Sequence, residues 1–477
     1  MLFNSLVFAL FLPTVFALYW GIGASRWWAQ NILIVAASYV FYGWWDPRFL
    51  LLIIVSSATD YVLGAQIFRC QVQKTRRRLL FLSLTVNLGI LGVFKYFNFF
   101  VDSARSAFES LGFAPPAIAL EIILPVGISF YTFQTVSYSI DIYRKRLEPI
   151  ENVATFFAFT AFFPQLVAGP IERAKRLLPQ FARPRHFDPA AASDGLRQML
   201  WGFVKKVMIA DNLAPHVELA FTQYETLDGV ALGCGALLFS VQLYCDFSGY
   251  SDMAIGMSRL FGINLSQNFA YPYFARTMRE FWRRWHISLS TWFRDYVYIP
   301  LGGARVSPQR AAINVLIVFG VSGLWHGANW TFVIWGILNG LYTLPALLRN
   351  QAVPDAVAGD QGRLPTVGEL SGMIRTMALW TFGLVFFRAD TVSHAGGFFA
   401  QGLKSPWLGH VDHGQFLLPL LAGFGLICVE WFNRDRPHTL SIEAWPVTAR
   451  WATYIGLGLA LIIFGNVHTR AFVYFQF

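Results

Sequence analysis

A histidine within an apolar stretch is the residue of clearest chemical interest in this sequence. His326 lies in residues 322–330 (SGLWHGANW), inside a segment from Ile313 to about Leu348 that is otherwise suited to span a bilayer. An ionisable side chain at membrane depth is unfavourable unless it has a function or a buried partner. With an ordinary pKa of about 6.5, imidazole can take a proton from a hydroxyl group at neutral pH. The sequence therefore indicates chemistry inside a membrane.

The neighbours of His326 suit the wall of a narrow tunnel. A helical count places Ser322 and Asn329 beside the imidazole, although Gly323 and Gly327 weaken the helix prediction. Small and polar side chains next to a histidine are what such a wall requires. The alternative is a buried histidine that only bonds a neighbouring helix and holds the packing together.

The stretch from residue 268 to 303 is a second candidate for chemistry. Its central part, residues 281–296, reads FWRRWHISLSTWFRDY. At 100° per residue its aromatic side chains share one helical face, with His286 at the edge of that face. So charged a helix is unsuited to hydrocarbon, and we expect a re-entrant or interfacial helix that brings His286 towards His326 from the cytoplasmic side. The alternative for His286 is an interfacial position without a special role.

Two carboxylates, Asp246 and Asp252, lie at the end of another apolar segment. Carboxylates at that depth can orient a base or bind a cation. We favour the structural interpretation, in which they form ion pairs that assemble the fold. The expected partners are Arg259, Arg283 and Arg284.

The composition predicts an all-α polytopic membrane protein. Of the 477 residues, 55% are hydrophobic and 13% are charged, whereas soluble domains carry about 25% charged residues. At about 20 residues per span, the apolar segments supply about 11 transmembrane helices, besides re-entrant or interfacial ones. We expect one integral membrane domain over residues 1–477, with a re-entrant and catalytic segment at about 265–345 and a flexible linker at about 351–369. The N-terminal segment is expected to be a retained first span, not a removable signal peptide.

The formal charge of +10 is concentrated in short basic clusters between apolar runs, at residues 69–78, 144–146 and 173–185. This pattern follows the positive-inside rule and favours contact with anionic membrane lipids, not with nucleic acid. Because three apolar segments precede the first cluster, we expect an extracytoplasmic N-terminus. The four cysteines are far apart or in apolar segments, and they indicate neither a disulfide framework nor a metal site.

Taken together, residues 282–296 and the sequence LWHG at 324–327 resemble the membrane-bound O-acyltransferase family, and within it the alginate O-acetyltransferase branch. Residues 127–141 (GISFYTFQTVSYSID) and 163–171 (FPQLVAGPI) are also similar to that family. The resemblance covers nearly the whole chain and is strongest from about 120 to 345.

This resemblance implies a multi-helix fold around a central tunnel. It implies that His326 matches the near-invariant catalytic histidine of the family and that His286 matches its second site position. It further implies that an acyl group is taken from a cytoplasmic thioester and delivered across the bacterial inner membrane. The expected group is acetyl, and the expected donor is acetyl-CoA. Periplasmic acetyltransferases would then place the group on an exopolysaccharide such as alginate, and no bound cofactor is expected.

Acyl transfer needs a nucleophile, a base within about 3 Å of its proton, and stabilisation of the oxyanion. We assign His326 as the base and His286 to donor positioning or proton relay. The remaining candidate side chains are placed along the tunnel or near the donor phosphates; they are Trp325, Asn329, Ser322, Arg283, Arg284, Arg294 and Asp295. No serine lies in a Gly-x-Ser-x-Gly turn and no cysteine is near either histidine, so direct attack on the thioester and transient acylation of His326 both stay open.

Three other functions are compatible with the same residues. The chain can be a passive acyl conduit or transporter, with all transfer chemistry done by another protein. It can transfer D-alanine from a carrier protein, as in the related teichoic acid branch. It can also acylate a lipid that stays in the bilayer.

Overall fold

The computed structural model describes residues 1–113, 122–349, 358, 364–407, 411–465, 470, 472 and 473. These residues contain helices and no strand, which confirms the predicted all-helical fold. The chain divides into two compact units, Met1–Ala192 with Met257–Leu265 and Ser193–Gly256 with Ser266–Phe477, called unit 1 and unit 2 below. The single membrane domain stays a prediction. Most of the expected linker at 351–369 lies outside the described residues, and its last three residues already belong to a helix that begins at Val367.

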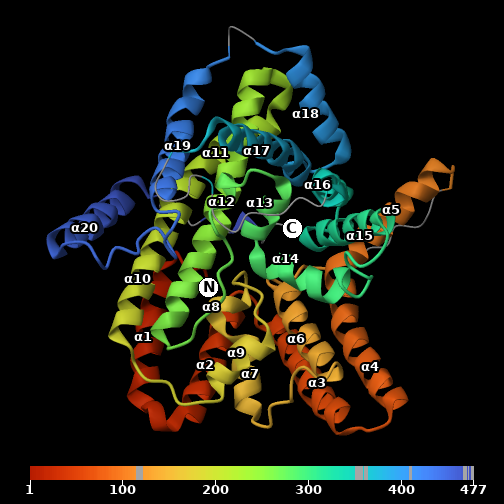
Figure 1. Cartoon of the computed structure of the whole chain (residues 1–477), viewed down its shortest axis with the longest axis vertical. Coiled ribbons are helices and arrows are strands. Elements are labelled where there is room, and N and C mark those ends of the chain that lie inside the picture. The colour runs from red at the N-terminus through yellow and green to blue at the C-terminus, as the bar shows by residue number, and fades with distance from the viewer. Residues whose placement is uncertain are drawn as a thin grey trace. The chain divides into compact units, whose positions relative to one another are not determined.

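Unit 1 contains the helices α1 to α9, the first residues of α10 and the last four residues of α12 (Gly229–Leu260), and Figure 1 labels these helices. The first ten helices are α1 (Leu6–Ile22), α2 (Trp27–Gly43), α3 (Leu50–Arg69), α4 (Gln73–Leu91), α5 (Phe97–Ser110), α6 (Ile128–Tyr143), α7 (Val153–Ala161), α8 (Phe163–Leu166), α9 (Ala174–Phe181) and α10 (Pro189–Phe203).

Helices α3, α4 and α6 pack together around a buried carboxylate. Asp60 of α3 is fully buried and accepts hydrogen bonds from Asn87 Nδ2 of α4 at 2.8 Å and from Ser139 Oγ of α6 at 2.6 Å. Ser83 of α4 donates a further bond to the same carboxyl group. A carboxylate out of water needs such donors, so this cluster fixes the three helices side by side.

Unit 2 contains the rest of α10, α12 up to Gly256, and the other helices that follow α10. They are α11 (Asp211–Thr222), α12 (Gly229–Leu260), α13 (Met278–Arg284), α14 (Ile287–Phe293), α15 (Pro308–His326), α16 (Trp330–Leu348), α17 (Val367–Arg388), α18 (Val392–Lys404), α19 (Leu417–Phe432) and α20 (Val447–Phe464). Single 3-10 or π-helical turns occur at η1 (Ala24–Arg26), η2 (Pro47–Phe49), η3 (Gly92–Tyr96), η4 (Val204–Ala210), η5 (Tyr224–Thr226), η6 (Pro272–Phe274), η7 (Arg294–Tyr298) and η8 (His413–Phe416).

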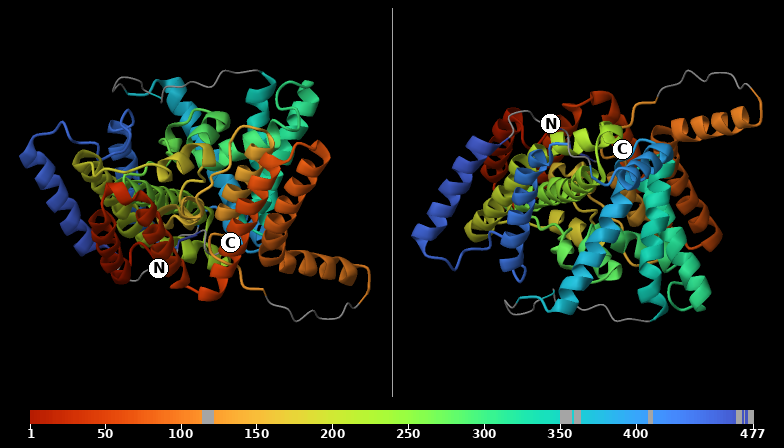
Figure 2. Two further views of the ribbon diagram at one scale, coloured as in Figure 1. Left: turned by 90° about the horizontal axis from the view of Figure 1, so that it is seen from below. Right: turned by 90° about the horizontal axis from the view of Figure 1, so that it is seen from above.

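Among the described residues, seven helices are long and apolar enough to cross a membrane, or eight if the bent pair α1 and α2 counts as one span. The chain is therefore a multi-pass membrane protein. The number is lower than the expected 11 because several apolar segments form shorter helices. Residues 153–169 are split between α7 and α8, and residues 197–216 between α10, η4 and α11. Helix α20, the deep-blue helix at the left of both views in Figure 2, is long and apolar enough to cross a membrane, although none of its spanning window is buried in the protein.

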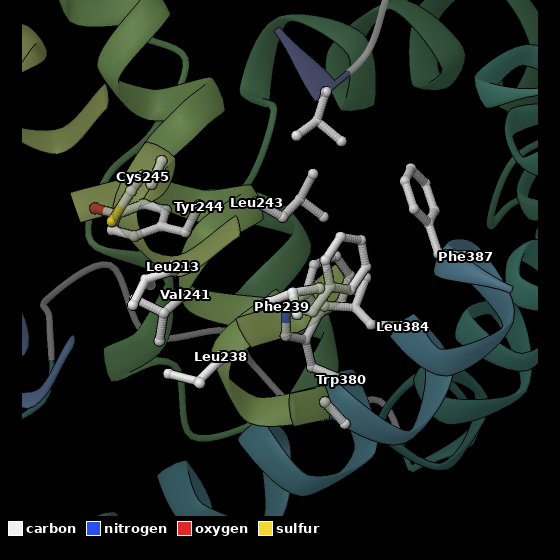
Figure 3. Packing of buried hydrophobic residues seen from close by; sticks show 14 of the residues in the cluster. Leu213, Leu238, Phe239, Val241, Leu243, Tyr244, Cys245, Trp380, Leu384 and Phe387 are labelled. Atoms are coloured by element: carbon white, nitrogen blue, oxygen red, sulfur yellow. The ribbon is translucent and has the colours of Figure 1, made fainter. Parts of the chain in front are cut away.

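The core of unit 2 lies around α12, whose spanning window is 72% buried. Phe239 of α12 faces Trp380 and Leu384 of α17 in a cluster of buried aromatic and aliphatic side chains (Figure 3). Phe387, one turn further along α17, belongs to the same cluster. This apolar packing holds α17 against α12 and supports the residues of the candidate site.

Helices α15 and α16 form an antiparallel pair that lies side by side in Figure 1. Two glycines allow their backbones to approach. A Cβ atom at Gly323 would lie 2.2 Å from the carbonyl oxygen of Phe332, and one at Gly336 would lie 2.3 Å from that of Phe319. Small residues at helix contacts are the usual means of close packing in membranes.

We expect G336A to destabilise unit 2, because the new methyl group must push α15 and α16 apart, at a loss of roughly 1–3 kcal/mol. The measurement is the thermal unfolding temperature of the purified protein in detergent. The matched control is G456A on α20, where nothing lies within 4 Å of the added Cβ. There alanine should be neutral or stabilising, by about 1 kcal/mol, because of its higher helix propensity. Equal effects of the two substitutions would contradict the close approach.

Candidate active site

A break in the helical backbone places His286. Helix α13 ends at Arg284 and α14 begins at Ile287, with Trp285 extended (φ −103°, ψ 128°) and His286 in the left-handed region (φ 45°, ψ 52°). The amphipathic helix predicted over residues 281–296 is therefore wrong as one continuous element. Its residues form α13, α14 and the π-helical turn η7. Because a non-glycine residue with positive φ is strained, surrounding contacts must hold this conformation.

Asn268 supplies those contacts from a neighbouring stretch. Its carbonyl oxygen accepts the N–H of Ile287 at 3.0 Å, and its side-chain Oδ1 accepts the N–H and the hydroxyl of Ser288 at 3.2 and 2.9 Å. Ala270 N–H donates to the carbonyl of Arg284 on the other side of the break, at 3.0 Å. The backbone groups that a continuous helix would have paired internally are thus satisfied by residues 268–270.

His326 is the last residue of α15, at the start of the turn into α16. The helix ends there because Gly327 is extended (φ −156°, ψ 146°), and a Cβ at this position would lie 2.1 Å from the ring of Phe332. Asn329 then caps α16 by accepting the N–H of Thr331 at 3.0 Å. The glycine and the asparagine therefore make a tight turn that fixes the direction of the imidazole.

The two imidazoles are brought together inside unit 2. Their ring centroids are 6.4 Å apart, with His286 fully buried and His326 2% exposed. Aromatic rings pack against them. The ring centroid of Phe247 lies 4.6 Å from that of His286, and the ring centroid of Trp335 lies 5.0 Å from that of His326. His286 is outside the candidate spans, and burial lowers its pKa to about 3. His286 is therefore neutral at physiological pH.

A cavity of about 240 Å³ lies between residues 279–298 and the helices α15 and α16. The imidazoles are not among its lining residues, but Ser290 and Ser322 are, each one helical turn from a histidine. The cavity is lined by Arg279, Trp282, Leu289, Ser290, Phe293, Arg294, Tyr298, Val315, Val318, Phe319, Ser322, Thr343 and Leu347. It suits an apolar chain that carries an anionic group at one end. A tunnel that reaches both histidines stays a prediction.

The other residues proposed from the sequence take different positions. Trp325 is buried, with its ring 5.0 Å from that of His326 and 6.0 Å from that of His286. The amide of Asn329 donates to the carbonyl of Asp390 at 2.8 Å, so it connects the turn to the end of α17.

The three arginines proposed from the sequence, Arg283, Arg284 and Arg294, have different surroundings. Arg294 lines the cavity and pairs with Asp295 at 2.7 Å. Arg284 is buried and pairs with Glu280 at 3.1 Å, and Arg283 is exposed. Their roles towards a substrate remain predictions.

The carboxylates of α12 pair with lysines of the π-helical turn η4 and not with the expected arginines. Asp246 contacts Lys206 Nζ at 2.6 Å, and Asp252 contacts Lys205 Nζ at 2.6 Å. The ion-pairing interpretation is confirmed, but the partners predicted from the sequence are wrong. The π-helical geometry that directs both adjacent lysines towards α12 leaves no periodic signal in the sequence.

Sequence reasoning missed Asn268, Phe247, Trp335 and Arg279. Asn268 and Phe247 contact residues about 20 and 39 positions away, while Trp335 and Arg279 belong to the site only because the chain folds back on itself, so spacing alone does not reveal them. Only Asn268 had a visible signal, because an amide side chain just before an aromatic stretch often bonds backbone groups. Among the described residues, no three His, Cys, Asp or Glu side chains are grouped to hold a metal ion.

The chain is similar to one known protein family and to several bacterial proteins. The model of the membrane-bound O-acyltransferase family matches residues 144–382, which include both histidines. A probable alginate O-acetylase of Azotobacter vinelandii is 44% identical over 75% of this chain and 71% of that protein. A peptidoglycan O-acetyltransferase of Helicobacter pylori is 36% identical over 83% of this chain and 78% of that protein. A teichoic acid D-alanyltransferase of Streptococcus thermophilus is 32% identical over 45% of this chain and 55% of that protein.

The helical fold, the buried histidine pair and these similarities define a multi-pass membrane enzyme that transfers acyl groups to hydroxyls. The chain belongs to the membrane-bound O-acyltransferase family.

We expect the stability of the protein to fall as the pH drops below about 6.5, because the unfolded state takes up a proton on His286 that the folded state, with a pKa of about 3, does not. Between pH 7 and pH 5, this proton uptake lowers the free energy of unfolding by about 2 kcal/mol. Thermal unfolding of the wild type and H286Q at both pH values measures it. H286Q, which cannot be protonated, should lose less stability than the wild type. A parallel loss in both proteins would contradict the assignment.

Proposed function

We propose that this chain moves an acetyl group from cytoplasmic acetyl-CoA across the bacterial inner membrane for O-acetylation of an exported polysaccharide, and that periplasmic acetyltransferases complete the transfer. The similarity to alginate and peptidoglycan O-acetylating proteins supports the acetyl group and the polysaccharide. The observation that carries the proposal is the pair of buried imidazoles, 6.4 Å apart, each four residues in sequence from a serine that lines the cavity.

His326 acts as the base. It takes the proton of an acceptor hydroxyl while the hydroxyl oxygen forms a bond to the thioester carbonyl carbon. The carbon–sulfur bond then breaks, and the thiolate takes the proton from the imidazolium of His326. His286, kept neutral by burial, orients the donor by hydrogen bonding. The exclusion of water by the surrounding aromatic rings strengthens each of these polar interactions.

The cavity receives the donor. Arg279 and Arg294 offer charge-assisted hydrogen bonds to phosphate groups, and the apolar wall formed by α15 accommodates the chain that ends in the thioester. Ser290 and Ser322 of the wall lie four residues from His286 and His326 in the sequence. The position of Arg294 in the wall supports the phosphate role that the sequence also suggested for Arg283 and Arg284.

Transfer of D-alanine is the second candidate, supported by the similarity to a teichoic acid D-alanyltransferase. A D-alanyl thioester carries an ammonium group, which needs an acidic partner. The described residues that line the cavity include two arginines and no acidic side chain. Like charges at short range in a low-dielectric site are unfavourable, so the cavity favours the uncharged acetyl group.

We put the basic cluster at residues 69–78, at the end of α3 and the start of α4, on the cytoplasmic side. An extracytoplasmic N-terminus then requires an odd number of crossings before this cluster, with α1 and α2 as two separate crossings and not as one bent span. The donor then enters from the cytoplasm, where acetyl-CoA is made, and basic clusters contact anionic lipid headgroups.

We expect H326A to abolish polymer acetylation in cells, by at least about 100-fold, because a positioned general base contributes about 10²–10⁴-fold. H286A should retain measurable activity, since it loses orientation and not the base. The readout is acetate released from the isolated polymer, at equal amounts of protein in the membrane. The control is H216A, a partly exposed histidine of α11 away from the cavity. Full acetylation by the H326A strain would reject the catalytic role and favour a passive conduit.

We expect R279A and R294A to raise the KM for acetyl-CoA by roughly tenfold each, because each removes a charge-assisted hydrogen bond worth about 1.5–3 kcal/mol. Inverted membrane vesicles supplied with radiolabelled acetyl-CoA give the measurement. R310A, at the exposed start of α15 and outside the cavity, is the control. If label is transferred only from an aminoacylated carrier protein and not from acetyl-CoA, the acetyl-CoA assignment would be rejected in favour of a D-alanyl donor.

A further inference from the structure

Two residues near the end of the sequence, Phe472 and Val473, are packed into the core of unit 2. Phe472 is 2% exposed and stacks on Tyr250 of α12, with ring centroids 5.2 Å apart at 28°. The backbone N–H of Val473 donates to Asp246 Oδ2 of the same helix at 2.7 Å. Both contacts are buried, so this short segment has a defined place against α12.

The segment is anchored by ion pairs. Asp246, which holds Val473, also contacts Lys206 Nζ at 2.6 Å, and Lys206 contacts Asp211 at 2.9 Å. All three charged side chains are buried. Removing one member of such a group leaves an uncompensated charge out of water and is strongly unfavourable. The carboxylate that receives Val473 is therefore held in one position.

From this anchor, a line of aromatic contacts leads to the candidate active site. The ring of Phe472 lies 5.5 Å from that of Phe247, and Phe247 lies 4.6 Å from the imidazole of His286. Phe247 is fully buried and also touches Phe269, at 5.0 Å. In a close-packed interior, removing one neighbour of a buried ring lets that ring shift, and the group packed against the ring then shifts as well.

His286 needs such support more than a residue within a helix would. Its backbone is left-handed and the break on either side of it is held by Asn268. Asn268 fixes the backbone of the break, while Phe247 contacts the ring. The orientation of the imidazole therefore depends on where Phe247 lies.

We propose that Phe472 is a positioning residue, which holds the imidazole of His286 in its working orientation through Phe247. It contacts neither donor nor acceptor. The proposal rests on the role of His286 in the proposed function, and it adds that residues about 185 positions further along the chain set the geometry of acyl transfer.

The test uses the full chain in lipid nanodiscs or inverted vesicles. F472A removes the ring that supports Phe247, and kcat for acetyl transfer should fall about tenfold, since small misplacements of catalytic groups have effects of up to 10²-fold. The KM for acetyl-CoA should change less than twofold, because the cavity is lined by other residues. F472L fills most of the space, and kcat should return to within about twofold of the wild type. F472V replaces F472A if the alanine variant does not give a monodisperse protein.

The matched control is F416A, which removes an equally buried ring of η8 from the hydrophobic core of unit 2, where Phe416 makes no ring contact with His286 or Phe247 that the structure shows among the described residues. It should lower thermal stability and leave kcat unchanged. The direct readout is the NMR signal of His286 in protein labelled with ¹³C-histidine, assigned by its absence from H286Q. This signal should shift in F472A and not in F416A.

An unshifted His286 signal with unchanged kcat in F472A would overturn the positioning role. Equal losses of kcat in F472A and F416A would also overturn it, because the effect would then be general destabilisation. A wild-type protein without acetyl transfer would instead reject the proposed function, while the shift of the His286 signal would still report on the contact.

Discussion

The site depends on one backbone constraint, the interruption of the helix between Arg284 and Ile287. In a continuous helix the N–H groups of Ile287 and Ser288 would bond within the helix, and His286 would follow the helical spiral of its neighbours. Instead these N–H groups bond to Asn268, and His286 adopts positive φ. A strained conformation persists only where its surroundings determine it fully, and such strain is common at functional sites. The buried imidazole is thus held by the chain before any substrate binds.

Around this break, unit 2 separates charge from the imidazoles. The lysines of η4 are neutralised by Asp246, Asp252 and Asp211, while aromatic rings surround His286 and His326. Two protonated imidazoles 6.4 Å apart in such surroundings would repel each other strongly. Burial lowers the pKa of His286 to about 3, which fits the proposed role of His326, and not of His286, as the base. The apolar enclosure is thus consistent with the proposed function.

The sequence predicted the helical class, most of the spans and the proximity of the two histidines. These follow from hydropathy and from ionisable residues in or beside apolar segments. It did not predict the interruption at His286, since the aromatic pattern of residues 281–296 fits one helix equally well and only the bonds to Asn268 select the break. The partners of Asp246 and Asp252 were missed for a related reason. Arginines close in sequence were the natural choice, yet η4 directs Lys205 and Lys206 towards α12. Long-range contacts decided each of these points, and local spacing carries no record of them.

The same separation of charge bears on which acyl group the site accepts. An acetyl group presents a methyl and a carbonyl, and it can leave the cavity wall at Ser290 or Ser322 and approach the aromatic enclosure without a counter-ion. An aminoacyl group would have to bring an ammonium past Arg279 and Arg294, and Asp295 is already paired with Arg294. The desolvation of that ammonium would be uncompensated. In the proposed function, the charges around the donor therefore favour the acetyl group, before any contact with the acceptor is made.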